Sequence, residues 1–158
     1  MYSSHVITVT DYHLRQHELQ ENVVVLGGGL AGCEMAIHLA REKKNVTLVE
    51  RDGALAPDAN IRHRPLLLAE IEKSGIQVLL NHKAVAITPD AVLCEDAQQQ
   101  RLALPGQSVI CALGQRARRD MVDELWDCAP WVSQVGDCVK VSTITTAIYQ
   151  GHHAAMGI

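Results

Sequence analysis

Short apolar runs and stretches with helical spacing alternate along the first half of the chain. The runs at residues 23–26, 46–50 and 76–80 are rich in Val, Ile and Leu and predict buried strands. Residues 30–40 and 66–73 carry apolar side chains at the spacing of an amphipathic helix. The order strand, helix, strand, helix, strand predicts a parallel sheet with right-handed crossovers.

The pattern changes after residue 83, where turn residues become frequent. Three short strands are expected there, at residues 84–88, 91–95 and 100–104. Turn residues such as Pro89-Asp90 separate them, so we expect an antiparallel meander. A further apolar run, at residues 109–114, suits a central parallel strand.

The last part of the chain is more polar and predicts fewer regular elements. Residues 115–130 suggest a surface crossing with a helical stretch around 121–125. A strand is expected at 131–135, closed by Gly136-Asp137, and a final helix at 143–156. The predicted fold class is α/β: a Rossmann-like parallel sheet with helices on both faces and an antiparallel three-strand meander.

The turn after the first strand contains Gly27-Gly28-Gly29-Leu30-Ala31-Gly32, a G-x-G-x-x-G pattern. In a dinucleotide-binding turn, the first glycine (Gly27) permits the tight turn, and the second (Gly29) lets the backbone approach a pyrophosphate. The third, Gly32, lets the helix pack closely against the sheet. The helix N-terminus then faces the phosphates with its unpaired N–H groups.

Glu50 ends the second predicted strand, eighteen residues after Gly32, where an acid accepts hydrogen bonds from a ribose 2′-hydroxyl. This context favours dinucleotide binding over an empty structural turn or a turn that binds S-adenosylmethionine. The acid favours NAD(H), whereas the neighbouring Arg51 would accept a 2′-phosphate and leaves NADP(H) open.

Composition excludes several other classes of function. The chain has a net charge of −4 and only a short basic cluster, at residues 116–119. It therefore lacks the basic stripe with which proteins bind nucleic acid. No apolar run is long enough to span a bilayer, and residues 1–20 contain no apolar signal core. We therefore expect a cytoplasmic protein that binds neither nucleic acid nor membrane.

The five cysteines form no C-x-x-C pair, and the eight histidines are scattered. Only His13 and His17 have i, i+4 helical spacing, without an obvious third ligand, so no metal site is expected. Cys33 lies in the first turn of the phosphate-binding helix, which could activate its thiol; a buried, unreactive role is favoured.

Several segments together carry a family resemblance. They are residues 24–34, 46–50, 112–114 and 135–140, with 147–151 behind them. The chain resembles the pyridine-nucleotide-disulfide oxidoreductase superfamily. It is most similar to the C-terminal part of the NADH:flavin oxidoreductases that include 2-enoate reductase and 2,4-dienoyl-CoA reductase.

The resemblance implies further cofactor contacts at Ala112, Gly114 and Gly136. It also implies that Asp137 holds the ribityl chain of FAD and that Glu34 lies near the nicotinamide. Each acid has a simpler alternative: Glu34 would interact with the helix dipole, and Asp137 would cap the segment before the last helix.

The domain organisation implied by the resemblance is a connector at 1–22, an NAD(H)-binding Rossmann domain at 23–115 and a closing FAD-binding segment at 116–158. The implied parent enzyme passes hydride from NADH to FAD, then electrons to FMN and an enoate or enoyl-CoA type alkene. This chain contains neither the FMN barrel nor the first half of the FAD fold. We therefore expect a module that is inactive alone and retains neither FAD nor FMN.

Other interpretations remain. One is a non-catalytic nucleotide-binding or regulatory module, and another is a methyltransferase-like fold, against which the meander argues. If the flavin-binding half and barrel are the missing partners, residues 1–15 and 131–158 would expose apolar surface without them. A homo-oligomer is then expected.

Overall fold

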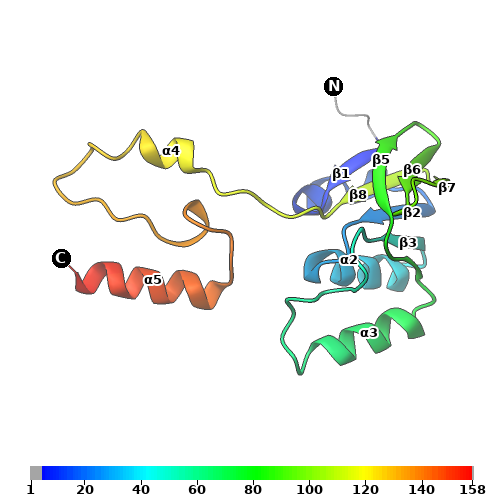
Figure 1. Cartoon of the computed structure of the whole chain (residues 1–158), viewed down its shortest axis with the longest axis horizontal. Coiled ribbons are helices and arrows are strands. Elements are labelled where there is room, and N and C mark those ends of the chain that lie inside the picture. The colour runs from blue at the N-terminus through cyan, green and yellow to red at the C-terminus, as the bar shows by residue number, and fades with distance from the viewer. Residues whose placement is uncertain (1–4, 158) are drawn as a thin grey trace. The chain divides into compact units, whose positions relative to one another are not determined.

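The computed structural model describes residues 5–157 and divides into two units, one ending at Leu113 and the other beginning at Gly114. The first unit is built on a five-stranded parallel sheet with strand order β1-β8-β2-β3-β4 (Figure 1). Its strands are β1 (Val6–Thr8), β2 (Asn22–Leu26), β3 (Asn45–Val49), β4 (Gln77–Leu79) and β8 (Ser108–Cys111). The predicted parallel sheet, with residues 109–111 in a central strand, is confirmed.

Helices and a second sheet complete this unit. Its helices are α1 (Tyr12–Arg15), α2 (Leu30–Arg41) and α3 (Arg64–Lys73), with 3-10 turns η1 (Val9–Asp11) and η2 (Gln16–Glu18). The second sheet is the antiparallel meander β5 (Lys83–Ile87), β6 (Ala91–Glu95) and β7 (Arg101–Pro105). All three meander strands lie within one residue of their predicted positions.

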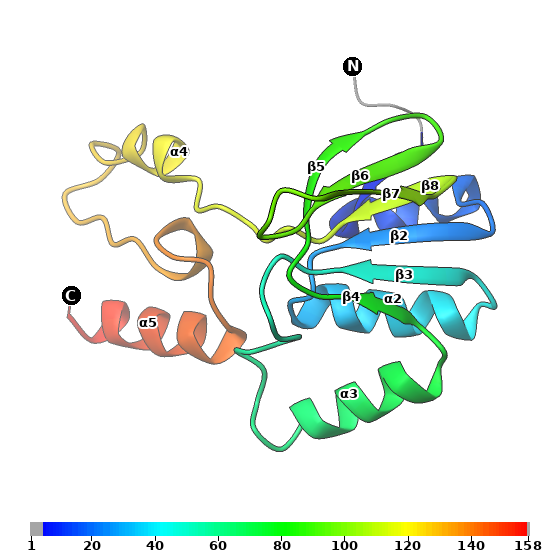
Figure 2. The same cartoon turned by 45° about the vertical axis from the view of Figure 1, so that its right-hand side comes forward.

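The expectation of helices on both faces of the sheet is wrong. Val23 and Val25 of β2 lie in one core cluster together with buried residues of α1, α2 and α3. Val24 and Leu26 point to the opposite face, where they join Val92 and other apolar residues of the meander. Figure 2 shows the meander strands and helices α2 and α3 on different sides of the parallel sheet. A parallel sheet must be covered on both faces, and here the meander covers the second one.

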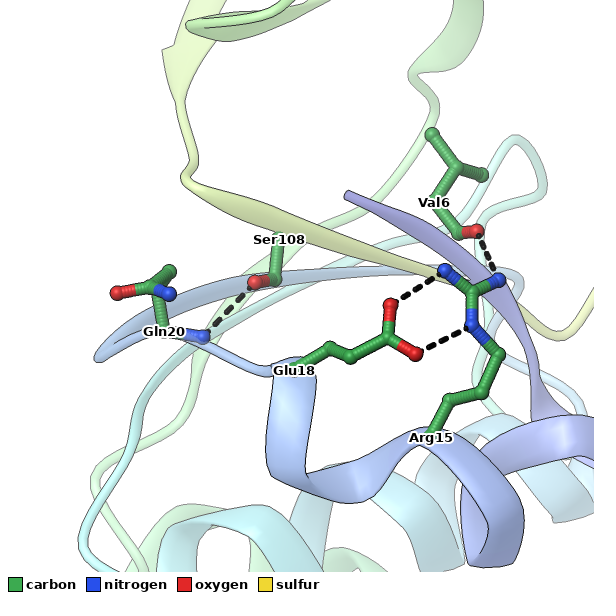
Figure 3. Close-up of polar contacts among 5 residues, drawn as sticks. All are labelled: Val6, Arg15, Glu18, Gln20 and Ser108. Carbon is green, nitrogen blue, oxygen red and sulfur yellow. Dashed lines mark hydrogen bonds and ion pairs between the residues drawn. The ribbon is translucent and has the colours of Figure 1, made fainter. Parts of the chain in front are cut away.

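The N-terminal segment is part of the sheet. Its Val6–Thr8 stretch, within the predicted connector 1–22, pairs in parallel with β8 as the edge strand. Arg15 donates to the Val6 carbonyl at 3.2 Å and makes a two-pronged ion pair with Glu18 (Figure 3). The Gln20 amide donates to the buried hydroxyl of Ser108 at 2.9 Å. These contacts fix the segment against β1 and β8.

The second unit contains α4 (Arg119–Asp123), the 3-10 turn η3 (Gly136–Cys138) and α5 (Ile144–Met156). Thr143 caps α5 by accepting from the Thr146 amide at 3.3 Å. The strand predicted at 131–135 does not form, although Val135 has an extended backbone with φ −140° and ψ 155°. A strand needs a partner ladder, and no strand is found among residues 114–157.

Candidate functional site

The glycine turn lies where β2, β3 and β8 end, and backbone hydrogen bonds fix it there. The Gly27 amide donates to the Val49 carbonyl, and the Ala112 amide donates to the Leu26 carbonyl, both at 2.8 Å. Gly27 has φ +103°, and a Cβ there would lie 2.5 Å from the Ala112 carbonyl oxygen. Both facts require glycine at this position.

Gly32 allows α2 to lie against the turn. A Cβ on Gly32 would be 1.8 Å from the Gly27 carbonyl oxygen, a distance that no side chain can occupy. The helix can therefore begin this close to the strand only with glycine here. This is the close helix packing that the sequence pattern predicts for its third glycine.

Gly29 differs from the other glycines of the turn because nothing lies within 4 Å of the position of its missing Cβ. Its backbone is extended, with φ −66° and ψ −179°, and it precedes the first residue of α2. Gly29, Leu30 and Ala31 are exposed. The first N–H groups of a helix lack acceptors within it, so this end offers donors and open space to an anion.

Glu50 follows β3 and turns its carboxylate toward the glycine turn. Its Oε2 accepts from the Gly28 amide at 2.5 Å, and its Oε1 accepts from the Asp52 amide at 2.9 Å. Each carboxylate oxygen has two lone pairs, so acceptor positions remain for a ribose diol. Arg51 is exposed and forms a 3.6 Å ion pair with Asp52.

Two residues that contact the turn were not expected from the sequence. They are Leu55 and Ala56, in the loop before α3, and they are buried, with 6% and 1% of their surface exposed. The Ala56 amide donates to the Gly28 carbonyl at 2.7 Å, and a Cβ on Gly28 would lie 2.4 Å from Leu55 Cδ2. The signal for them was the apolar run Ala54-Leu55-Ala56 in a loop that also carries Asp52 and Asp58.

Glu34 lies just after the first turn of α2. Because α2 begins at Leu30, Glu34 is its fifth residue. Its side chain is exposed and lines a groove between α2 and α3 together with His38 and His63. The proximity of Glu34 to a nicotinamide stays a prediction.

The remaining predicted contacts belong to the second unit. Gly114 and Gly136 have φ +89° and +71°, which favour glycine at both turns. Asp137 is exposed, and its Oδ1 accepts from the Ser142 amide at 3.2 Å, just before the Thr143 cap. Asp137 thus stabilises the segment leading to α5, and its contact with FAD stays a prediction.

Cys33 is buried beneath the turn, where its thiol donates to the Gly28 carbonyl at 3.3 Å. Burial, followed by the Glu50 and Glu34 carboxylates, raises the pKa of Cys33 to about 11. This agrees with the unreactive role favoured from the sequence.

We expect iodoacetamide at pH 8 to modify the exposed Cys128 and leave Cys33 unmodified, since little Cys33 thiolate exists below its raised pKa. Mass spectrometry of the digested protein measures both sites in one sample. Labelling of Cys33 as fast as Cys128 would contradict this.

Among residues 5–157, no group of three His, Cys, Asp or Glu residues could hold a metal ion. Within the same range, no helix has the length and apolar character needed to cross a membrane.

The glycine turn, the acid after β3 and the meander occur in a chain whose residues 4–151 match the pyridine nucleotide-disulphide oxidoreductase family. The chain belongs to this family. Its members are oxidoreductases that use a nicotinamide dinucleotide and a flavin, which removes the methyltransferase-like interpretation.

Relatives within the family are reductases and oxidases. A bilirubin reductase of Mediterraneibacter gnavus is 37% identical over 134 residues, 84% of this chain and 21% of that protein. A cinnamate reductase of Clostridium sporogenes is 26% identical over 157 residues, 97% of this chain and 23% of that protein. A solved 2-naphthoyl-CoA reductase complex matches with a TM-score of 0.87 at 25% identity, over 97% of this chain and 23% of that chain. The chain thus spans about a fifth to a quarter of these relatives.

Proposed function

We propose that this chain is the NAD(H)-binding module of a larger flavin-dependent reductase. The observation that supports this is the open space at Gly29, at the N-terminus of α2 and beside the carboxylate of Glu50. The open space at Gly29 can take a pyrophosphate, whose path a Cβ at this position would block. The Glu50 carboxylate can accept hydrogen bonds from both hydroxyls of a ribose diol.

Each part of the site has a separate task in this proposal. Gly29, Leu30 and Ala31 face the pyrophosphate, Glu50 accepts from the ribose, and Ala112 lies against the turn at the end of β8. The bound nicotinamide would supply the hydride. The protein contributes position and electrostatics rather than a reacting side chain.

The further electron path is also part of the proposal. Hydride would pass to an FAD held in part by Gly136 and Asp137, and electrons would continue to FMN and an enoate or enoyl-CoA type alkene. Relatives named cinnamate reductase and 2-naphthoyl-CoA reductase support this substrate class. We propose that the chain by itself retains neither flavin and does not reduce an alkene.

Titration with NADH, followed by nicotinamide fluorescence, tests the proposal directly. We expect saturable NADH binding by a purified chain without a flavin absorbance band. Absence of NADH binding would contradict the proposal that the chain is an NAD(H)-binding module. A flavin band that survives gel filtration would contradict the proposed absence of flavin.

We predict that the chain binds NADH about 10-fold or more tightly than NADPH, because Glu50 accepts from the ribose diol and repels a 2′-phosphate. Glu50→Ala should narrow this ratio toward one. Glu72→Ala, at an exposed position on α3, is the matched control and should leave the ratio unchanged. Equal affinities for NADH and NADPH in the unmodified chain would contradict the proposed role of Glu50.

We also propose that the second unit is covered by another protein surface. None of residues 114–157 is buried, and the exposed large apolar residues there include Trp126, Trp131, Ile148 and Tyr149. In a larger reductase the flavin-binding half would cover this surface. In the isolated chain a second copy would do so.

Self-association is the expected result for the isolated chain. Sedimentation should show a dimer or larger species at micromolar concentration, and Trp131→Glu should shift it toward the monomer by placing a charge in the apolar surface. A strict monomer in the unmodified chain would contradict this proposal.

A further inference from the structure

The loop between β3 and α3 folds back over the glycine turn. It touches the turn through the Ala56 amide, which donates to the Gly28 carbonyl, and through the buried Leu55 side chain. At its other end, the Asp52 amide donates to the Glu50 carboxylate. The loop therefore contacts both the Gly28 peptide and the acid expected to bind the ribose.

This loop conformation is not stable by itself. Ala56 has φ +43°, in the left-handed region that residues with a Cβ adopt at a cost. A conformation of this kind persists only when surrounding contacts determine it. One such contact comes from outside the loop: the Arg64 side chain donates from Nε to the Leu55 carbonyl at 2.9 Å.

The position of Arg64 is unusual for an arginine. It is the first residue of α3, where a positive charge opposes the helix dipole. Among the residues that the structure describes, its side chain makes one hydrogen bond, the one to Leu55. Helix stability therefore does not explain Arg64, whereas the loop contact does.

Arg64 also acts electrostatically on the thiol beneath the turn. The pKa of the buried Cys33 thiol is raised by burial first and then by Glu50 and Glu34, and Arg64 acts in the opposite direction. The guanidinium and both carboxylates therefore act on the same thiol beneath Gly28. This agrees with the hydrogen-bond geometry.

We propose that Arg64 is a positioning residue for the dinucleotide site. Through Leu55 it holds the loop against Gly28 and Glu50, so that the adenosine end of NADH meets a preformed surface. This inference rests on the proposed NAD(H) binding and adds a residue that acts on the glycine turn and the acid through its hydrogen bond to Leu55.

Three substitutions test whether Arg64 holds the loop through its hydrogen-bond donor or through its positive charge. In Arg64→Gln, the amide nitrogen falls at the place of arginine Nε, so the donor stays and the charge is lost. In Arg64→Leu, both are lost while the aliphatic stem is largely kept. Arg62→Leu, at an exposed position on the same loop, removes the same charge away from Leu55 and is the control.

We expect Arg64→Leu to weaken NADH and NADPH binding by the same factor, about 5- to 10-fold, because both cofactors share the adenosine end. Arg64→Gln and Arg62→Leu should stay within about 2-fold of the unmodified chain. If Arg64→Gln loses as much affinity as Arg64→Leu, the charge acts and the inference is wrong. Unchanged affinity in Arg64→Leu, or a loss confined to NADPH, would also overturn it.

Hydrogen exchange gives a readout that does not depend on ligand binding. The Ala56 amide should exchange at least about 10-fold faster in Arg64→Leu, while the Val25 amide in β2 keeps its protection. Arg64→Gln should match the unmodified chain at both amides, and equal Ala56 exchange in all variants would overturn the inference. If Arg64→Leu does not fold, Arg64→Lys, whose donor lies beyond the Nε position, replaces it with the same expectations.

The two proposals fail separately. If the unmodified chain does not bind NADH, the proposed function is wrong, and the exchange of the Ala56 amide still decides the role of Arg64. If it binds NADH but Arg64→Leu changes neither affinity nor exchange, only the role of Arg64 is wrong.

Discussion

Gly29→Val is expected to abolish NADH binding, by about 100-fold or more in Kd, while the fold stays intact. Nothing lies within 4 Å of the Cβ position at Gly29, and its backbone is extended, so valine fits without a clash. The cost to folding should be limited to about 1 kcal/mol from a poorer residue at the helix N-cap. The same side chain would occupy the space through which a pyrophosphate approaches α2.

The matched control is Gly151→Val in α5, which also places a valine where no atom lies within 4 Å. Valine is a better helix former than glycine, so this variant should fold and bind NADH normally. Fluorescence titration measures binding, and circular dichroism checks the fold. Unchanged affinity in Gly29→Val would contradict the site.

Gly32→Ala is expected to destabilise the protein by about 3 kcal/mol or more. The added methyl group would lie 1.8 Å from the Gly27 carbonyl oxygen, so α2 would have to move away from β2. That movement would separate Cys33 and Ala36 from the core that they fill. Chemical denaturation monitored by circular dichroism measures the loss.

Gly29→Ala provides the control for this prediction. It adds the same methyl group three residues earlier, where nothing lies within 4 Å, and should change the unfolding free energy by about 1 kcal/mol or less. Similar stabilities of the two variants would show that the helix does not pack as closely as the structure indicates.

Strong local patterns predicted the centre of the fold. The strands at 23–26 and 46–49 and the helix from residue 30 follow from apolar periodicity, and glycine spacing distinguished the three tasks of Gly27, Gly29 and Gly32. Each of these features depends on neighbours along the chain. The position of Glu50 beside the turn also follows, because parallel strands end at the same edge of a sheet.

Predictions were less accurate where the outcome depended on distant parts of the chain. The run at 131–135 has strand-like residues but no ladder partner among residues 114–157, so it stays irregular. The stretch at Val6–Thr8, placed in a connector, finds its partner in β8, about one hundred residues later. The choice between strand and irregular chain depended on pairing rather than on local sequence.

The sequence by itself determined the βαβ unit, the meander and the family, because periodicity, turn residues and glycine spacing are local properties. The tertiary structure decided that the meander, and not a helix, covers the second face of the sheet. It also decided that Leu55 and Ala56 lie on Gly28 and that Arg64 holds them there. These contacts join a loop to a turn some thirty residues away, and α3, which follows the loop, packs against α2 and the shared core.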